Sequence, residues 1–233
     1  MVLAFWIFAS TMKILREIQM KGKQSDAIFH QIESSIQLNN FVKPILPFPN
    51  TRNWVSSPDF LAVIVKNVLL KRPKVIVELG SGVSSLYGGY LLKQHHIEGK
   101  LYSVDHEIDY TKKAINLVKD HQLNDFVEVL HCPLVRQNIN DHSWTWYDID
   151  NIKLNEIDFL IIDGPPTNEV YNARYPAIPM FYKYLDSGAI ILVDDYDRKG
   201  ETEMVKKWLA EYPDLVFVEK LYTEKGTAVL MKK

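Results

Sequence analysis

The sequence has little cysteine and no excess of charge of either sign. Cys132 is the one cysteine among 233 residues, which excludes an internal disulfide and a zinc site built from several cysteines. A lone cysteine is typical of reducing compartments, so we expect a cytoplasmic protein. Basic and acidic side chains number 27 and 29, and the net charge of −2 creates no field that would attract polyanions. We therefore expect no nucleic-acid partner.

The sequence also lacks an apolar run long enough to span a membrane. Residues 1–9 are apolar, but Lys13 soon follows, and a spanning helix needs about 20 apolar residues. One interpretation is an amphipathic helix that continues through Ile14 and Ile18 and packs on the body or on a second subunit. The other is peripheral membrane contact through residues 1–20. The sequence leaves the oligomeric state undefined.

Two further helical patterns precede the main domain. Residues 25–38 place three isoleucines four apart on one helical face, at Ile28, Ile32 and Ile36. Ser57 followed by Pro58 is typical of a helix N-cap and first turn. We therefore divide the chain into an N-terminal helical extension and lead-in, residues 1–70, and a main domain, residues 71–233.

From residue 74 onward, short apolar runs alternate with amphipathic segments of helix length. The runs are KVIVEL (74–79), LYSVD (101–105), FVEVL (126–130), IDFLIID (157–163) and AIILVDD (189–195), and the intervening helical segments include 83–94, 108–120 and 174–186. Continuous apolar runs are typical of strands covered on both faces. The pattern predicts an α/β fold with a Rossmann-like, doubly wound, mostly parallel sheet. Residues 214–221 and 227–233 predict a C-terminal antiparallel hairpin.

Small and polar residues follow the first predicted strand, where a ligand binds in open α/β sheets. They are Gly80, Ser81, Gly82, Ser84 and Ser85. Glycines let a ligand approach the backbone, and the start of a helix offers free N–H groups. Glu78 ends a buried strand, so we expect its carboxylate to meet a polar or cationic ligand group. Asp105 ends the second strand, where a carboxylate can accept both hydroxyls of an adenosine ribose.

Both nicotinamide cofactors and S-adenosylmethionine use this arrangement. A dinucleotide site favours a third small residue, usually glycine, where Ser85 stands. ELGSGVSS followed by YSVDHE instead resembles the first two motifs of class I S-adenosylmethionine-dependent methyltransferases, in a branch similar to small-molecule O-methyltransferases. The resemblance covers residues 71–233.

This resemblance implies a cofactor, a sheet and several contacts. The cofactor is S-adenosyl-L-methionine, and the sheet has seven strands, of which the last is antiparallel. Glu78 neighbours the methionine amino group, and His106 is a candidate to face adenosine. Many members place an acidic residue near the end of the third strand to meet adenine, whereas this chain has Cys132, Pro133 and Leu134 there. Cys132 is therefore a candidate adenine contact.

Three aspartates follow the later strands. Asp163 ends the fourth run, and Asp194 and Asp195 end the fifth. Their convergence would need a positive partner. The arrangement resembles metal-dependent O-methyltransferases that act on sugars and catechols, which implies that these residues hold Mg²⁺ and that Asp163 and Asp194 take part in catalysis. Alternatively, Asp195 caps the next helix or pairs with Arg198.

Several other residues could contact an acceptor molecule. Tyr171, Arg174 and Tyr175 follow a stretch rich in small residues, and Arg174 would suit an anionic or sugar acceptor. Trp144 and Trp146 could stack on a ring or pack in a helix.

The sequence thus predicts an enzyme that transfers a methyl group from S-adenosylmethionine to a hydroxyl of a small molecule such as a sugar, with Mg²⁺ assistance left open. The alternative enzyme is an NAD(P)-dependent oxidoreductase. The alternative from another class is a non-catalytic adenosyl-binding or scaffold protein.

Overall fold

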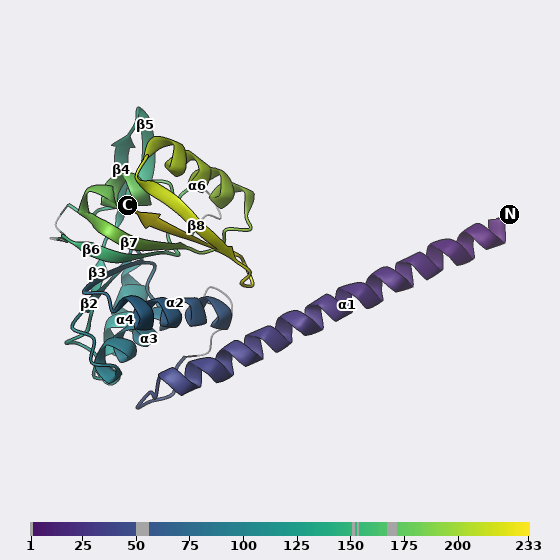
Figure 1. The fold of residues 1–233 in the computed structure, drawn as a ribbon, viewed down its shortest axis with the longest axis horizontal. Coiled ribbons are helices and arrows are strands. Elements are labelled where there is room, and N and C mark those ends of the chain that lie inside the picture. Colours follow the sequence, from purple (N-terminus) through teal and green to yellow (C-terminus); the bar gives the residue numbers. More distant parts are fainter. Residues whose placement is uncertain (1, 50–55, 151, 153, 167–171) are drawn as a thin grey trace.

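The computed structural model describes residues 2–49, 56–150, 152, 154–166 and 172–233, with the side chains of residues 2–5, 7–9 and 23 left out. A body built on a central sheet carries one long helix, α1 (Val2–Phe41), which runs away from it toward the N-terminus (Figure 1). Among the described residues, no helix has the length and apolar character needed to cross a membrane.

The main sheet has seven strands, as predicted. Their spatial order is β3 (Val127–His131), β2 (Lys100–Asp105), β1 (Val75–Leu79), β6 (Ile157–Ile162), β7 (Leu185–Val193), β9 (Thr227–Lys232) and β8 (Leu215–Leu221). The pairs from β3 through β7 are parallel, and β9 is antiparallel to both of its neighbours. The Rossmann-like fold class and the C-terminal antiparallel hairpin are therefore confirmed.

Helices cover both faces of this sheet, because successive strand residues point to opposite sides. Val77 and Leu79 face one core and Ile76 faces the other. The first core is closed by α5 (Ala177–Phe181), α6 (Lys199–Glu211) and a small hairpin of β4 (Leu134–Ile139) and β5 (His142–Tyr147). The second is closed by α2 (Pro58–Lys71), α3 (Val83–Gln94) and α4 (Ile108–Asp120), with the end of α1.

Two predicted segments differ from the structure. The long helical crossover expected over residues 174–186 is only the short α5 and a 3₁₀ turn, η1 (Tyr182–Tyr184). The helix considered around Trp144 and Trp146 is instead strand β5, in which Trp146 is fully buried and Trp144 stacks on Tyr175.

The N-terminal helices differ as well. Residues 25–38 do not form a separate second helix, because α1 continues through them without a break. Ile28, Ile32 and Ile36 are all exposed. Ile14 and Ile18 are also exposed, so the expected packing of this segment on the body is wrong, while packing on a second subunit stays a prediction. Among the described side chains of α1, those that meet the body lie in its last third, where Gln31 bonds to Asp59 and Ser34 and Leu38 are buried.

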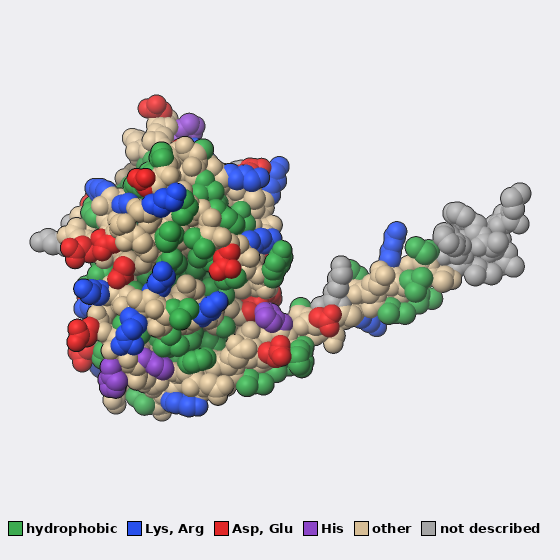
Figure 2. Space-filling view, viewed as in Figure 1, with side chains coloured by type: hydrophobic (Ala, Val, Ile, Leu, Met, Phe, Trp, Pro, Cys, Tyr) green, Lys and Arg blue, Asp and Glu red, His purple; other side chains and the backbone are tan. Residues whose placement is uncertain are grey.

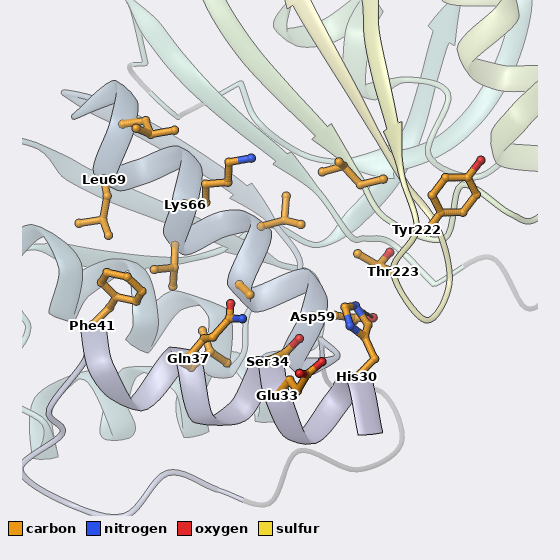
Figure 3. A pocket seen from close by; sticks show the side chains of 16 residues that line it. His30, Glu33, Ser34, Gln37, Phe41, Asp59, Lys66, Leu69, Tyr222 and Thr223 are labelled. Carbon is orange, nitrogen blue, oxygen red and sulfur yellow. Dashed lines mark ion pairs between the residues drawn. The ribbon is translucent and has the colours of Figure 1, made fainter. Parts of the chain in front are cut away.

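Asp59 ties three elements together at the base of α1. Its buried carboxylate accepts hydrogen bonds from the Gln31 side chain of α1 and from the backbone N–H of Phe60 in α2. It also accepts the backbone N–H of Glu224, in the turn between β8 and β9, at 2.7 Å. These contacts border a hollow of about 700 Å³ between α1, α2 and that turn (Figure 3).

Candidate functional site

A pocket of about 340 Å³ lies at the carboxyl ends of the central parallel strands. In open α/β sheets this edge is where ligands bind, because loops from several strands converge there. The loops after β1, β2, β6 and β7 and the turn between β8 and β9 all contribute. Its walls include Ser56, Gly80, Ser81, Gly82, Ser84, Asp105, His106, Tyr147, Asp163, Arg174, Asp195, Arg198 and Lys225.

Two glycines bring the loops after β1 and β6 into close contact. Gly80 has φ of 101°, a left-handed conformation that glycine adopts without strain. A side chain on Gly164 would lie 2.5 Å from the Tyr147 hydroxyl and 3.1 Å from the carbonyl of Leu79. The loops after β1 and β6 are therefore so close at these glycines that a side chain would not fit between them. As a result, backbone atoms line the pocket here.

Glu78 lies beneath the first loop and does not line the pocket. Its Oε2 accepts hydrogen bonds from the hydroxyls of Ser85 and Ser103, the second at 3.1 Å. Its Oε1 is buried and has no hydrogen-bond partner among the described residues. Burial raises the pKa of Glu78 to about 7, and the nearby charge of Asp163 adds to the rise. This carboxyl therefore titrates near neutrality.

Asp105 lines the pocket and holds the first loop. Its Oδ2 accepts the backbone N–H and the hydroxyl of Ser81, at 3.1 and 2.6 Å, and its Oδ1 accepts the N–H of Glu107 at 3.0 Å. His106 lies beside it, with Nδ1 3.6 Å from Asp105 Oδ1. Ser81 of the first loop therefore already donates hydrogen bonds to the Asp105 carboxylate that is expected to bind the ribose hydroxyls.

Cys132 is close to this region but faces the core. Its backbone N–H donates to the carbonyl of Asp105 at 2.7 Å, while its buried thiol lies outside the pocket wall. Burial raises the pKa of the thiol to about 11, so it stays protonated and unreactive at neutral pH.

The three predicted aspartates do come together. One oxygen from each of Asp163, Asp194 and Asp195 lies within 4.8 Å of the others. The buried guanidinium of Arg174 is the nearest positive group: its Nη2 lies 2.7 Å from Asp195 Oδ2 and 3.7 Å from Asp163 Oδ1. The carbonyls of Pro165 and Asp194 accept its other hydrogen bonds. Arg174 is thus fixed from several sides.

Two more cations approach the same cluster. Arg198 Nη2 lies 3.0 Å from Asp195 Oδ1, and Lys225 Nζ lies 3.9 Å from oxygens of both Asp194 and Asp195. Asp194 is fully buried and neither carboxylate oxygen makes a hydrogen bond with the described residues. Burial, followed by the charges of Asp163 and Asp195, raises its pKa well above the ordinary range. Three carboxyls therefore face three cations from this chain.

Asp163 lines the pocket, and its carboxyl has a raised pKa. The hydroxyl of Ser56 donates to its Oδ2 at 3.1 Å. Burial raises the pKa of Asp163, while the positive charge of Arg174 opposes that rise. A carboxylate with a raised pKa is a stronger proton acceptor than an ordinary aspartate.

The structure sorts the predicted site residues into two groups. Those on the pocket wall are Gly80, Ser81, Gly82, Ser84, Asp105, His106, Asp163, Arg174 and Asp195. Those behind it are Glu78, Ser85, Cys132, Asp194 and Tyr175, whose hydroxyl donates to Glu211 instead. Tyr171 lies outside the described residues.

Sequence reasoning missed several wall residues. Ser56 precedes the N-cap of α2, Tyr147 ends β5, and Lys225 comes from the turn after β8. No local motif marks them, because each reaches the pocket through tertiary packing rather than through its position after a parallel strand.

The fold and this pocket define a class I S-adenosylmethionine-dependent methyltransferase. A family model described as a methyltransferase domain matches residues 77–196, and the chain belongs to that family. The matched region runs from β1 to just past β7 and includes most of the pocket wall. The protein is therefore an enzyme of the methyltransferase class. No curated protein sequence matches the chain.

Solved structures share the fold at low sequence identity. An O-methyltransferase from Bacillus cereus, in complex with SAH, is 16% identical with a TM-score of 0.58, over 89% of this chain and 91% of that chain. The O-methyltransferase TomG from Streptomyces achromogenes, involved in tomaymycin synthesis and solved with SAM, is 15% identical with a TM-score of 0.55, over 89% of each chain. The SAH-bound methyltransferase PaMTH1 from Podospora anserina is 16% identical with a TM-score of 0.58, over 87% of each chain.

Proposed function

We propose that this enzyme transfers the methyl group of S-adenosylmethionine to a hydroxyl of a small molecule, of which a sugar is the narrower candidate. The observation that carries the proposal is one pocket that joins the glycine loop and Asp105 to the partly exposed carboxyl of Asp163. The O-methyltransferase neighbours, solved with SAM or SAH, support the same chemistry.

The residues at the β1 and β2 ends fit the donor. The backbone of Gly80 and Gly82 can approach a ligand closely, and Ser81 and Ser84 offer hydroxyls on the wall. Asp105 would accept the ribose hydroxyls once the Ser81 hydroxyl gives up its place on Oδ2. Asp105 therefore exchanges one hydroxyl partner for another on donor binding.

Other candidates support the donor site, one from the pocket wall and the rest from behind it. His106 borders the expected adenosine position. Oε1 of Glu78 lies beneath the loop without a hydrogen-bond partner among the described residues, and we assign it to the donor's amino group, directly or through water. Ser85 fixes the other oxygen of Glu78. The N–H of Cys132 donates to the carbonyl of Asp105, and its thiol is buried away from the pocket. An adenine contact through this thiol is therefore disfavoured.

The acceptor is prepared by residues at the β6 and β7 ends. When bound, S-adenosylmethionine supplies a methyl group that its sulfonium has already activated, so the protein has to align the acceptor and remove its proton. Asp163 is placed to accept that proton, and its raised pKa strengthens it as a base. Arg174 holds Asp163 and Asp195 in place. Asp194 is too deeply buried to touch an acceptor and serves as a positioning residue for Arg174.

Mg²⁺ assistance is a second candidate, favoured by the three clustered carboxyls and the unpaired oxygens of Asp194. Oxygen ligands suit this ion, which supplies a Lewis acid where it is bound. The fixed guanidinium of Arg174 disfavours it, because the cluster already contains its counter-charge. We therefore derive the reaction from the side chains alone. Undiminished turnover in excess chelator would exclude the ion.

The family assignment sets the nicotinamide alternative aside. A cytoplasmic location remains our proposal and is supported by the single buried, protonated cysteine. Absence of a nucleic-acid partner likewise stays a prediction from the net charge.

The test is calorimetric titration with S-adenosylmethionine, followed by a turnover screen across sugars, phenols and amines with and without Mg²⁺. We expect donor binding that Asp105→Asn weakens about tenfold or more, since hydrogen bonds to a charged carboxylate contribute about 1.5–3 kcal/mol. Cys132→Ala is the matched control behind the wall and should leave donor affinity nearly unchanged. No heat with donor or its demethylated product would refute the donor site. Donor binding without product from any acceptor would favour the non-catalytic alternative.

A further inference from the structure

The projecting part of α1 exposes more apolar surface than a lone helix in water should. Residues 2–30 extend about 40 Å beyond the body at 1.5 Å per residue. Figure 2 shows hydrophobic side chains along this helix as it leaves the body. Eight large hydrophobic side chains of α1 are each more than half exposed: Trp6, Ile14, Ile18, Met20, Ile28, Phe29, Ile32 and Ile36. Exposed apolar surface on this scale marks an interaction site.

Five of these eight side chains share one face of the helix, namely Ile14, Ile18, Phe29, Ile32 and Ile36. At 100° per residue, six positions between residues 14 and 32 fall within about 80° of one another around the helix axis, and Ile36 continues the same face. We call these six positions the α1 stripe: Ile14, Ile18, Gly22, Ser25, Phe29 and Ile32. Ser34 and Leu38, which are buried against the body, lie on the opposite side of the helix. The stripe is therefore not an extension of the face that packs on the body.

From residue 14 to residue 32, the α1 stripe has the same order of residue types in either direction. Two apolar residues, two small residues and two apolar residues follow one another at spacings of three or four. Such spacing is that of a seam between two packed helices. In an antiparallel pair of identical helices, Ile18 would lie opposite Phe29, and Ile14 opposite Ile32. The two-fold axis would pass between Gly22 and Ser25.

Charge along α1 favours this antiparallel arrangement over a parallel one. Residues 11–22 carry Lys13, Arg16 and Lys21 against Glu17, whereas residues 24–36 carry Asp26 and Glu33. Antiparallel pairing places the basic half of each helix beside the acidic half of the other, and parallel pairing places like charges together. A lipid surface would attract the basic half and repel the acidic one.

Gly22 gives an independent indication of close contact. Glycine within a helix costs about 1 kcal/mol relative to alanine. A Cβ added at Gly22 would meet nothing within 4 Å among the described residues, so packing within that part of the chain does not require glycine there. A second helix that crosses closely at this position would require it.

We propose that the α1 stripe binds the same stripe of a second copy of this chain, antiparallel, with the closest approach at Gly22 and Ser25. Each copy then covers the apolar face that the other leaves in water. The interface is isologous, so a closed dimer forms rather than a filament.

The first experiment measures the mass of the full chain by sedimentation velocity over a range of concentrations. We expect a dimer, and Ile18→Glu should raise its dissociation constant at least tenfold. Met20→Glu is the matched control, because Met20 is also exposed but lies on the opposite side of the helix. A monomer at every concentration, or equal effects of the two variants, would overturn the proposal. A monomer that binds anionic phosphatidylglycerol vesicles through Ile18 would also overturn it.

The second experiment tests orientation with single-cysteine variants and a short bismaleimide cross-linker. Native Cys132 is buried and should stay silent. Mixed Ile14→Cys and Ile32→Cys chains should cross-link to each other. Ile14→Cys alone should not, because its two copies would lie about 30 Å apart in the antiparallel pair. Cross-linking of Ile14→Cys to itself would exclude this arrangement. Circular dichroism confirms that each variant keeps its fold.

Discussion

The pocket and α1 both contain side chains that need a partner, but the partners differ in origin. At the pocket, Arg174, Arg198 and Lys225 approach the clustered carboxyls within one chain. Along α1, large apolar side chains such as Ile18 and Phe29 remain in solvent. Neutralising buried charge requires fixed geometry, which a folded body supplies. Covering an apolar helix face requires only a complementary surface, which a second chain can supply.

This difference assigns separate tasks to the two regions. Substitutions in the pocket should change turnover or the stability of the body, because its charges depend on one another. Substitutions on the α1 stripe should change association first. The four predictions below test this separation, from the largest effect to the smallest.

Asp163→Asn should reduce kcat/KM about 10²- to 10⁴-fold, the usual contribution of a general base. The asparagine keeps the shape and the Ser56 contact but accepts no proton. Steady-state kinetics with a fixed acceptor measures the loss. Ser56→Ala is the milder control, with a loss of about tenfold or less. A kcat/KM that Asp163→Asn leaves unchanged would contradict the role of this carboxyl as the base.

Arg174→Gln should destabilise the body by about 3–5 kcal/mol, because it leaves Asp195 buried without its closest counter-charge. For a chain of this length the melting temperature should fall by about 10 °C. Arg198→Gln removes a half-exposed partner of the same carboxylate and should cost about 1 kcal/mol or less. Equal losses from the two variants would show that burial of the pair does not matter.

Stability should fall as pH rises through the titration of Glu78. Its carboxyl has a pKa of about 7 in the folded protein, above the ordinary 4.5, so the folded state holds the proton more tightly. That contribution is complete below pH 4.5 and is lost by about pH 7, to a total of about 3 kcal/mol. Asp163 and Asp194, whose pKa values are also raised, act in the same direction.

Denaturant unfolding at several pH values measures this loss, and Glu78→Gln should reduce the slope between pH 5 and 7. The pH dependence of stability that remains in the Glu78→Gln variant then measures the contribution of Asp163 and Asp194. A wild-type protein that gains stability over this range would show that burial does not control the titration.

Gly22→Ala should change helix stability and association in opposite directions, each by about 1 kcal/mol. Below the dissociation constant of the dimer, alanine should increase helical circular dichroism, because no described residue fills the space of its Cβ. In the dimer, the added methyl should separate the helices and weaken pairing. Gln19→Ala lies outside the α1 stripe and should leave association unchanged.

The sheet could be predicted because each strand is a continuous apolar run bounded by polar residues. The hairpin of β4 and β5 was missed although its turn carries a signal. Asn140 and Asp141 both have positive φ, at 48° and 61°, a conformation that asparagine and aspartate tolerate in two-residue hairpin turns. Polar and apolar residues also alternate over residues 143–146, within HSWTWY.

The pocket could be predicted where it follows parallel strands, as for Gly80 and Asp105. The role of Arg174 as the resident cation of the carboxyl cluster could not, because tertiary contacts with Pro165 and Asp195 fix its position and no local motif marks them. The extent of α1 was also unpredictable from periodicity. Ile32 belongs to the same apolar pattern whether that face meets a core or a second chain.

Asp59 gives the base of α1 a mechanical connection to the enzyme's entrance. The carboxylate that binds Gln31 also holds the N–H of Glu224, whose neighbour Lys225 reaches into the pocket. A tilt of α1 would thus pull on the lysine that faces the aspartates. If α1 from two chains pair, each subunit's turnover becomes sensitive to its neighbour, and dilution alone would alter the catalytic rate.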